Sequence, residues 1–162
     1  MSLDRAKAHL EQFGLAGRIQ LFDVSSATVE LAAQAVGCAP ARIAKTLSFL
    51  TPDGPVLILA AGDAKIDNSK YKARFHTKAK MIGHDEVEPL IGHGVGGVCP
   101  FGIHEGVPVW LDESLRRFDI VYPAAGTANS AVKLHLDELE RASQAQGWVD
   151  VCKGWRPEEP TI

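Results

Sequence analysis

Two stretches of the chain hold residue types that could perform chemistry: a lysine that begins an alternating run, and a loop rich in glycine. In GCAPARIAKTLSFL, residues 37–50, the side chains of Lys45, Leu47 and Phe49 fall on one face of an expected strand. A lysine in such a row must lie at a strand end, in a cleft or beside a partner, because burying a bare ammonium is too costly. Lys45 is therefore either a functional cation or a side chain whose head extends to water.

The glycine loop, GVGGVCPFG, covers residues 94–102. Its glycines permit unusual backbone conformations and let a ligand approach the main chain closely. Adjacent unpaired N–H groups can bind an oxyanion or a phosphate. The loop is not a Walker motif, since no Lys-Ser/Thr follows, and it is not a GxGxxG that opens a helix. A binding loop and a structural turn are both consistent with this spacing.

Cys99 lies in this loop, and His93 and His104 flank it. A thiol enzyme that acts on an ester is one alternative. However, nothing in the sequence indicates a lowered thiol pKa, and most single cysteines are small buried residues. The spacing of the three residues matches none of the usual zinc sites, so we predict no metal site.

One stretch of the chain is basic, with Tyr71, Phe75 and His76 between its charges; its cations are Lys65, Lys70, Lys72, Arg74, Lys78 and Lys80. Such a stretch can contact phosphates and stack bases. It is equally typical of a solvated helix face, with Asp63 and Asp67 nearby. Asn129, after Gly126, could bind a ligand, although an amide there more often holds a turn.

Composition restricts the function classes. The chain has 162 residues, a net charge of −3 and no apolar run long enough to span a bilayer. Its start lacks the apolar core of a signal peptide, and its three widely spaced cysteines favour a reduced, cytoplasmic setting. The acidic balance argues against general affinity for nucleic acid but allows a local basic patch. We expect a single domain over residues 1–162, with a mobile tail at 153–162.

Hydrophobic periodicity and turn residues predict the elements that position these groups. Helices are expected at 3–13, 28–36, 67–75, 85–92 and 137–146. Strands are expected at 19–22, 45–50, 55–61, 78–82, 108–111, 119–122, 131–135 and 148–152. Thr51-Pro52-Asp53-Gly54 joins the second and third strands as a hairpin. This order predicts an α+β fold with a mixed, largely antiparallel sheet.

Taken together, several stretches resemble the YbaK/EbsC family of aminoacyl-tRNA deacylases, which is related to the editing domain of bacterial prolyl-tRNA synthetases. The similar stretches are VELAAQAVGCAPARIAKTLSFL (29–50), GDAKIDNSKYKARF (62–75), GGVCPFG (96–102), VWLDESL (109–115) and AAGTANSAVKL (124–134). The lysine-threonine pair followed by a distant Gly-x-x-x-Pro loop is fairly specific as a combination. The family lysine corresponds to Lys45, and the Gly-x-x-x-Pro motif to Gly96 and Pro100.

The resemblance implies a barrel-like sheet surrounded by helices, with the site between the lysine strand and the glycine loop. It implies hydrolysis of the ester that joins a wrong amino acid to the 3′ end of a tRNA, without metal or organic cofactor. Lys45 would supply positioning and electrostatics, and N–H groups around Gly97 would stabilise the oxyanion. The expected substrate-binding residues are Thr46, Gly96, Cys99, Pro100, Phe101, Gly126 and Asn129, and the expected tRNA-binding residues are Lys70, Lys72 and Arg74.

The chain departs from the family pattern at residues 126–131 and 20–23, which could line the amino-acid pocket. Specificity is therefore open, and the expected substrate is tRNA(Pro) carrying a small amino acid. An aminoacyl-tRNA synthetase is the candidate protein partner, since the acidic charge predicts weak, salt-sensitive tRNA binding. The alternative function is a non-catalytic module that binds tRNA ends or an aminoacyl-like ligand.

Overall fold

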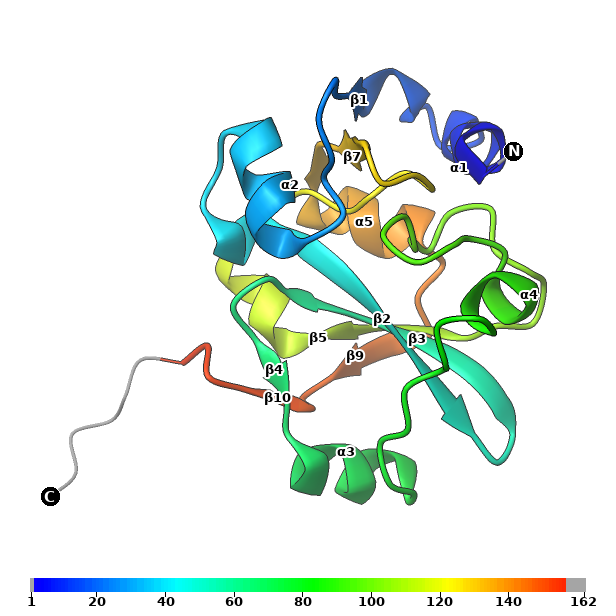
Figure 1. The fold of residues 1–162 in the computed structure, drawn as a ribbon. Coiled ribbons are helices and arrows are strands. Elements are labelled where there is room, and N and C mark those ends of the chain that lie inside the picture. The colour runs from blue at the N-terminus through cyan, green and yellow to red at the C-terminus, as the bar shows by residue number, and fades with distance from the viewer. Residues whose placement is uncertain (1, 157–162) are drawn as a thin grey trace, which may run out of the picture.

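The computed structural model describes residues 2–156 (Figure 1). The helices are α1 (Ser2–Glu11), α2 (Val29–Val36), α3 (Asn68–Phe75), α4 (Val87–Ile91) and α5 (Leu136–Ala142), and the 3₁₀ turns are η1 (Ala16–Arg18), η2 (Pro40–Arg42) and η3 (Glu113–Arg117). The strands are β1 (Ile19–Leu21), β2 (Ala44–Thr51), β3 (Gly54–Ala61), β4 (Lys65–Ile66), β5 (Val109–Asp112), β6 (Ile120–Val121), β7 (Ser130–Val132), β8 (Leu134–His135), β9 (Gly147–Val149) and β10 (Cys152–Lys153).

The largest sheet has the strand order β2-β3-β5-β9. The predicted hairpin is confirmed: β2 and β3 pair antiparallel from Ala44↔Ala61 to Thr51↔Gly54. Strand β3 then pairs parallel with β5, and β5 pairs parallel with β9. The sheet is mixed because long connections return the chain to β5 and β9 in the direction of β3.

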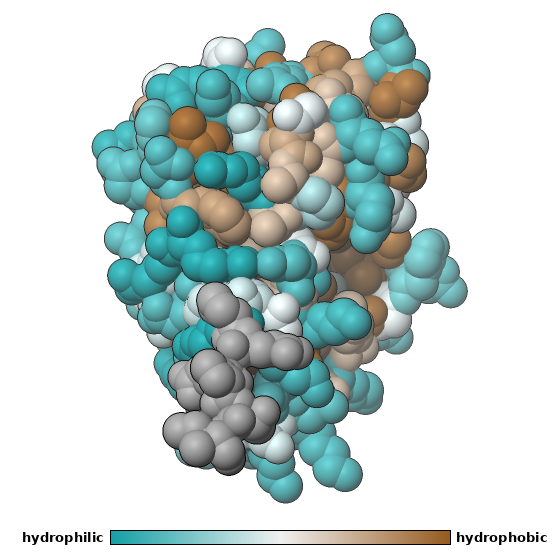
Figure 2. All heavy atoms as spheres, turned by 90° about the vertical axis from the view of Figure 1, so that its left-hand side faces the viewer, coloured by the Kyte–Doolittle hydropathy of each residue, from teal (hydrophilic) through white to brown (hydrophobic). Residues whose placement is uncertain are grey.

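Smaller two-stranded sheets pair β1 with β7, β10 with β4, and β6 with β8, all antiparallel. The predicted α+β class is therefore confirmed. Within residues 2–156 the sheets do not join into a closed barrel, so the expected barrel-like sheet is an open arrangement. Hydrophilic side chains cover most of the face that carries α2, with apolar residues in separate patches (Figure 2).

Several sequence-predicted bounds change. The strand expected at 78–82 is wrong: only Met81 forms a bridge there, with Phe49. The strand expected at 131–135 is divided at Lys133 into β7 and β8, which pair with different strands. The tail expected from residue 153 includes Lys153, which pairs with Lys65; residues 157–162 lie outside the described part of the chain.

The core is built around β3. Leu57, Ile58, Leu59 and Ala60 are fully buried, because β2 and β5 flank the strand and helices or loops cover both of its faces. A strand buried on both faces reads as a continuous apolar run, as VLILAA does here. This buried strand fixes the position of its neighbour β2.

The outer edge of β2 is covered at its two ends. At its start, Ala44 donates its N–H to the carbonyl of Tyr122 (3.1 Å). Further along, Ile82 donates to Ser48 (3.1 Å) and Leu50 donates to Lys80 (2.8 Å). Between these two contacts lies a gap in the strand edge at Thr46.

Candidate active site

A cavity of about 390 Å³ opens at this gap. Its volume is typical of sites for small ligands. One wall is β2, from Ala44 to Thr46 with Ser48, and the opposite wall is the glycine loop, with Val95, Gly96 and Val98. The remaining lining residues come from α2 and its approach, from the residue before β2, from the start of α4 and the segment before it, and from β7 and the connection that leads to it from β6: Ser26, Ala27, Thr28, Val29, Ala32, Ile43, Met81, Ile82, His84, Val87, Tyr122, Ala124, Ser130 and Ala131.

Local sequence explains how β2 reaches this position. Thr28 caps α2 by accepting the N–H of Leu31 (3.1 Å). Gly37 ends the helix with φ of 84°, a conformation that favours glycine. Pro40 then begins η2, where its missing N–H is not needed. The helix expected at 28–36 is confirmed, and these residues together direct the chain into β2 at Ala44.

Thr46 presents its main chain to the gap. In an antiparallel pair, alternate residues direct both their N–H and C=O groups away from the partner strand. Ala44, Ser48 and Leu50 bond outward, so Thr46 has the same orientation, with its N–H and C=O facing the gap. Its Oγ1 is buried and has no hydrogen-bond partner within residues 2–156. Thr46 therefore offers unused polar groups beside the cavity.

Lys45 also lines the cavity, and its ammonium donates a hydrogen bond to the carbonyl of Ala64. Burial lowers the pKa of this ammonium below its ordinary value, while the negative charge of Asp63 acts in the opposite direction. The carbonyl dipole holds the cation in place without neutralising it. Of the two interpretations of Lys45, the structure supports a half-buried cation at a cleft.

The turn that carries Ala64 is fixed from two sides. Arg117 of η3 binds the carboxylate of Asp63 through both terminal nitrogens, at 2.6 and 2.9 Å. Gly62 packs so closely that an added Cβ would lie 2.0 Å from the carbonyl oxygen of Pro40. The partner of Lys45 is thus held by contacts from η2 and η3.

On the opposite wall, Gly96 lines the cavity with φ of 92°. Among residues 2–156, the N–H groups of Gly96 and Val98 make no hydrogen bond. Gly97 differs: its N–H donates to Gly94 (3.1 Å), and its Cα packs against the peptide that joins Gly126 to Thr127. The unused N–H donors on this wall of the cavity therefore belong to the residues beside Gly97.

Gly97 and Gly126 instead line a second cavity of about 920 Å³, on the other side of the glycine loop, together with Arg5 and His104. Asn129 is exposed and holds a turn: its Nδ2 donates to Phe22 (3.2 Å), and its Oδ1 accepts from Thr127 (2.9 Å). The structure thus brings Lys45, Thr46 and Gly96 to one cavity and leaves Gly97, Gly126 and Asn129 outside it.

The remaining loop residues predicted to bind substrate do not line this cavity. Cys99 and Phe101 are fully buried in the core. Burial raises the pKa of the Cys99 thiol to about 12, and the thiol contacts the carbonyl of Phe101 (3.5 Å). Pro100 lines a third, smaller hollow beside His9. These three residues position the loop, and the protonated thiol is unsuited to act as a nucleophile.

The predicted tRNA-binding residues lie on α3, at the bottom of the molecule in Figure 1. Lys70 is engaged by the carboxylate of Asp150 (3.2 Å) and the carbonyl of Cys152 (3.3 Å). Arg74 stacks over Trp110, with its guanidinium carbon 4.6 Å from the ring centre. Lys72 is exposed and makes no ion pair within the described residues.

The described residues contain neither a metal-binding cluster nor a membrane-spanning helix. Within residues 2–156, no group of three or more His, Cys, Asp or Glu side chains is arranged to hold a metal ion. None of the described helices is long and apolar enough to cross a membrane.

Comparison with known proteins gives consistent results. Residues 24–142 match the model of the aminoacyl-tRNA editing domain. The chain is 47% identical over 156 residues to YwhH of Bacillus subtilis, an uncharacterized protein, covering 96% of this chain and 99% of that one. It is 33% identical over 73 residues to the proline–tRNA ligase of the same organism, covering 44% of this chain and 13% of the ligase.

A solved structure described as a candidate trans-editing enzyme for prolyl tRNA synthetase superposes with a TM-score of 0.85. It is 30% identical in sequence, and the alignment covers 94% of this chain and 98% of that one. The fold is therefore shared over almost the whole of both chains.

Proposed function

Because the chain belongs to the aminoacyl-tRNA editing domain family, we propose that it hydrolyses the ester of mischarged aminoacyl-tRNA. The preferred substrate is tRNA(Pro) carrying a small amino acid, and the reaction needs no metal. The observation that carries this proposal is the cavity at the edge of β2. Lys45 lines one wall, unused N–H groups belong to both walls, and no carboxylate is among the lining residues within 2–156.

In the proposed reaction, water adds to the ester carbonyl, and the bond from the carbonyl carbon to the ribose oxygen breaks. The products are the free amino acid and a tRNA with a free 3′ end. The carbonyl oxygen becomes negative in the transition state, so preorganised donors accelerate the reaction. The N–H groups of Thr46, Gly96 and Val98 are the candidates for this role, with Gly97 positioning the loop that carries two of them.

Lys45 supplies positive charge beside these donors. A half-buried ammonium interacts with a developing oxyanion or a phosphate more strongly than an exposed one, because the surroundings screen it less. Its lowered pKa also sets a limit at high pH: the charge is lost as pH rises through that pKa, and deacylation decreases with it.

The walls of the cavity contribute small side chains, such as Ala44 and Ala124, which suit a small amino acid.

The test is release of amino acid from Ala-, Ser- and Cys-tRNA(Pro) by wild type, Lys45→Ala and Lys65→Ala. Lys65 is a matched control, since it is an exposed lysine on β4, which pairs with β10, and it does not line the cavity. We expect wild type and Lys65→Ala to deacylate at least one substrate, and Lys45→Ala to lose most of the activity. Binding of charged tRNA without hydrolysis would favour the alternative of a binding module. Full activity in Lys45→Ala would refute the role of the lysine.

A further inference from the structure

We propose that the 3′ strand of the tRNA reaches the cavity along the segment that joins α3 to α4, residues 76–86. Lys72, Lys78 and Lys80 would contact its phosphates, and Met81 would contact its terminal base. This inference rests on the proposed function, since it takes an RNA end as the ligand of the cavity. It identifies a route, and it keeps Lys72 from the sequence prediction while Lys78 and Lys80 replace Lys70 and Arg74.

The segment leads from the basic helix to the cavity. In Figure 1 it rises from α3 at the bottom of the molecule, past β2, to α4. Two hydrogen bonds fix it to the edge of β2: Leu50 donates to Lys80, and Ile82 donates to Ser48. Residues 81, 82 and 84 then line the cavity. An extended chain from residue 78 to 84 spans up to about 20 Å, which is enough to guide a short single strand.

The charges along this route, from the end of α3 to the cavity, are available for a ligand. Lys72, Lys78 and Lys80 are exposed, and within residues 2–156 they take part in no ion pair or side-chain hydrogen bond. Lys72 and Lys78 line one surface hollow with Asn68, Ser69 and Ala79. Lys70 and Arg74 differ, because contacts with Asp150 and Trp110 already engage them. Because these three lysines make no ion pair or side-chain hydrogen bond, they can bind a phosphate without breaking an interaction within the protein.

The mouth of the cavity carries apolar side chains that face solvent. Met81 and Val95 both line the cavity, and they are 61% and 53% exposed. A methionine sulfur makes favourable contacts with aromatic rings, and a nucleobase offers such a ring. Asp85 and Glu86 come only after His84, so the cationic part of the segment approaches the cavity from one side.

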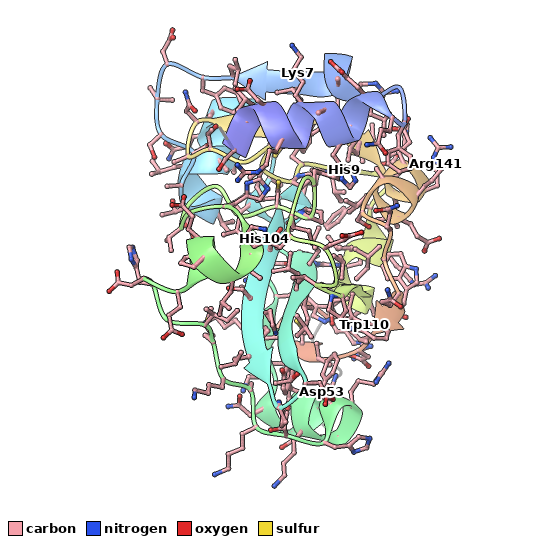
Figure 3. The ribbon with its side chains drawn as sticks, turned by 90° about the vertical axis from the view of Figure 1, so that its right-hand side faces the viewer. Lys7, His9, Asp53, His104, Trp110 and Arg141 are labelled. Atoms are coloured by element: carbon pink, nitrogen blue, oxygen red, sulfur yellow. The ribbon has the colours of Figure 1, made fainter. Side chains whose placement is uncertain are left out.

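The experiment measures the affinity for uncharged tRNA(Pro) as a function of salt concentration. Because uncharged tRNA carries no ester, this affinity does not depend on whether the protein is catalytically active. The variant Lys72→Gln/Lys78→Gln/Lys80→Gln is compared with Lys7→Gln/Lys133→Gln/Arg141→Gln, which removes the same charge. Figure 3 shows Lys7 and Arg141 at the opposite end of the molecule from α3. We expect the first variant to bind more weakly and to lower the slope of log affinity against log salt by about 2, roughly 0.7 for each phosphate contact.

The control variant should keep the wild-type slope. An equal change in both variants would show that overall charge, not a route, governs binding, and would overturn the proposal. An unchanged slope in the first variant, or no tRNA binding by wild type, would also overturn it. Melting curves of the variants verify that each remains folded.

Met81→Ser tests the other half of the proposal. We expect it to weaken binding of tRNA by about 2- to 10-fold. The loss should disappear with tRNA that lacks its terminal adenosine, because the contact is then absent in wild type as well. A loss of the same size with both tRNAs would refute the contact with the terminal base.

Discussion

Replacing Gly97 by alanine tests whether this residue positions the glycine loop. The added Cβ would lie 2.6 Å from the nitrogen of Thr127 and 2.7 Å from the carbonyl carbon of Gly126. Both are main-chain atoms, so no side-chain rotation relieves the contact. The loop and the turn at Gly126 must separate by roughly 1 Å to restore an ordinary contact distance.

Overpacking of this kind costs about 1–3 kcal/mol. For a domain of this size the melting temperature should fall by about 2–12 °C. The larger effect should be on deacylation. The N–H groups of Gly96 and Val98 move with the loop, and a displacement of about 1 Å at a catalytic group can reduce the rate by about 100-fold.

The matched control is Gly94→Ala, in the same loop. Its added Cβ would meet only the carboxylate end of Glu88, at 3.3 Å, and a flexible side chain can move away. We expect Gly94→Ala to resemble wild type in thermal melting and in deacylation of tRNA(Pro) substrates. A Gly97→Ala protein that melts like wild type would refute the steric argument. One that melts early but retains full activity would refute the role of the loop in catalysis.

Three further predictions concern the surroundings of the site. Cys99→Ser should deacylate within a few-fold of wild type, and native wild type should leave this thiol unmodified by a thiol reagent near neutral pH, because burial raises its pKa to about 12. The hydrogen bond from Arg117 lowers the pKa of Asp63, so their interaction stabilises the fold above the pKa of the unfolded carboxyl and is lost as pH falls through the lowered value. Urea unfolding from pH 7 to 3 should therefore show wild type more stable than Asp63→Asn at neutral pH and the two converging in acid; a constant difference would contradict this. Gly62→Ala should lower both the melting temperature and deacylation, because its Cβ would overlap a carbonyl oxygen of η2, whereas Gly17→Ala, with open space around it and away from the cavity, should change neither.

Helices and turns could be predicted from the sequence where residues close together in the chain determine the backbone conformation. The helix expected at 28–36 and the hairpin of β2 and β3 each depend on neighbouring residues, and both are confirmed. The strand expected at 78–82 was wrong because its residues alternate like a strand but find a partner only at Met81. Whether a segment forms a strand depends on the partner strand available to it as much as on its own alternation of side chains.

The site could be predicted only in part, for the same reason. Lys45, Thr46 and Gly96 have recognisable types and spacing, and the structure brings them to one cavity. The carbonyl of Ala64 carries no signal in the sequence, because every residue has a carbonyl and only the fold selects one. The role of Gly97 in packing against Gly126 was also hidden, since it depends on two turns distant in the sequence.

The pairing of β9 with β5, and of β10 with β4, has a consequence for the order of folding. The hairpin of β2 and β3 closes a two-residue turn and can form early. The parallel partners of β3 and β5 must first close long loops, whose entropy makes such contacts slow to form. Strand β10 pairs with β4, which directly follows Ala64, the hydrogen-bond partner of Lys45. The lysine is thus placed on its strand early, but its surroundings are completed only when the C-terminal strands dock, so activity should appear in the slowest phase of refolding.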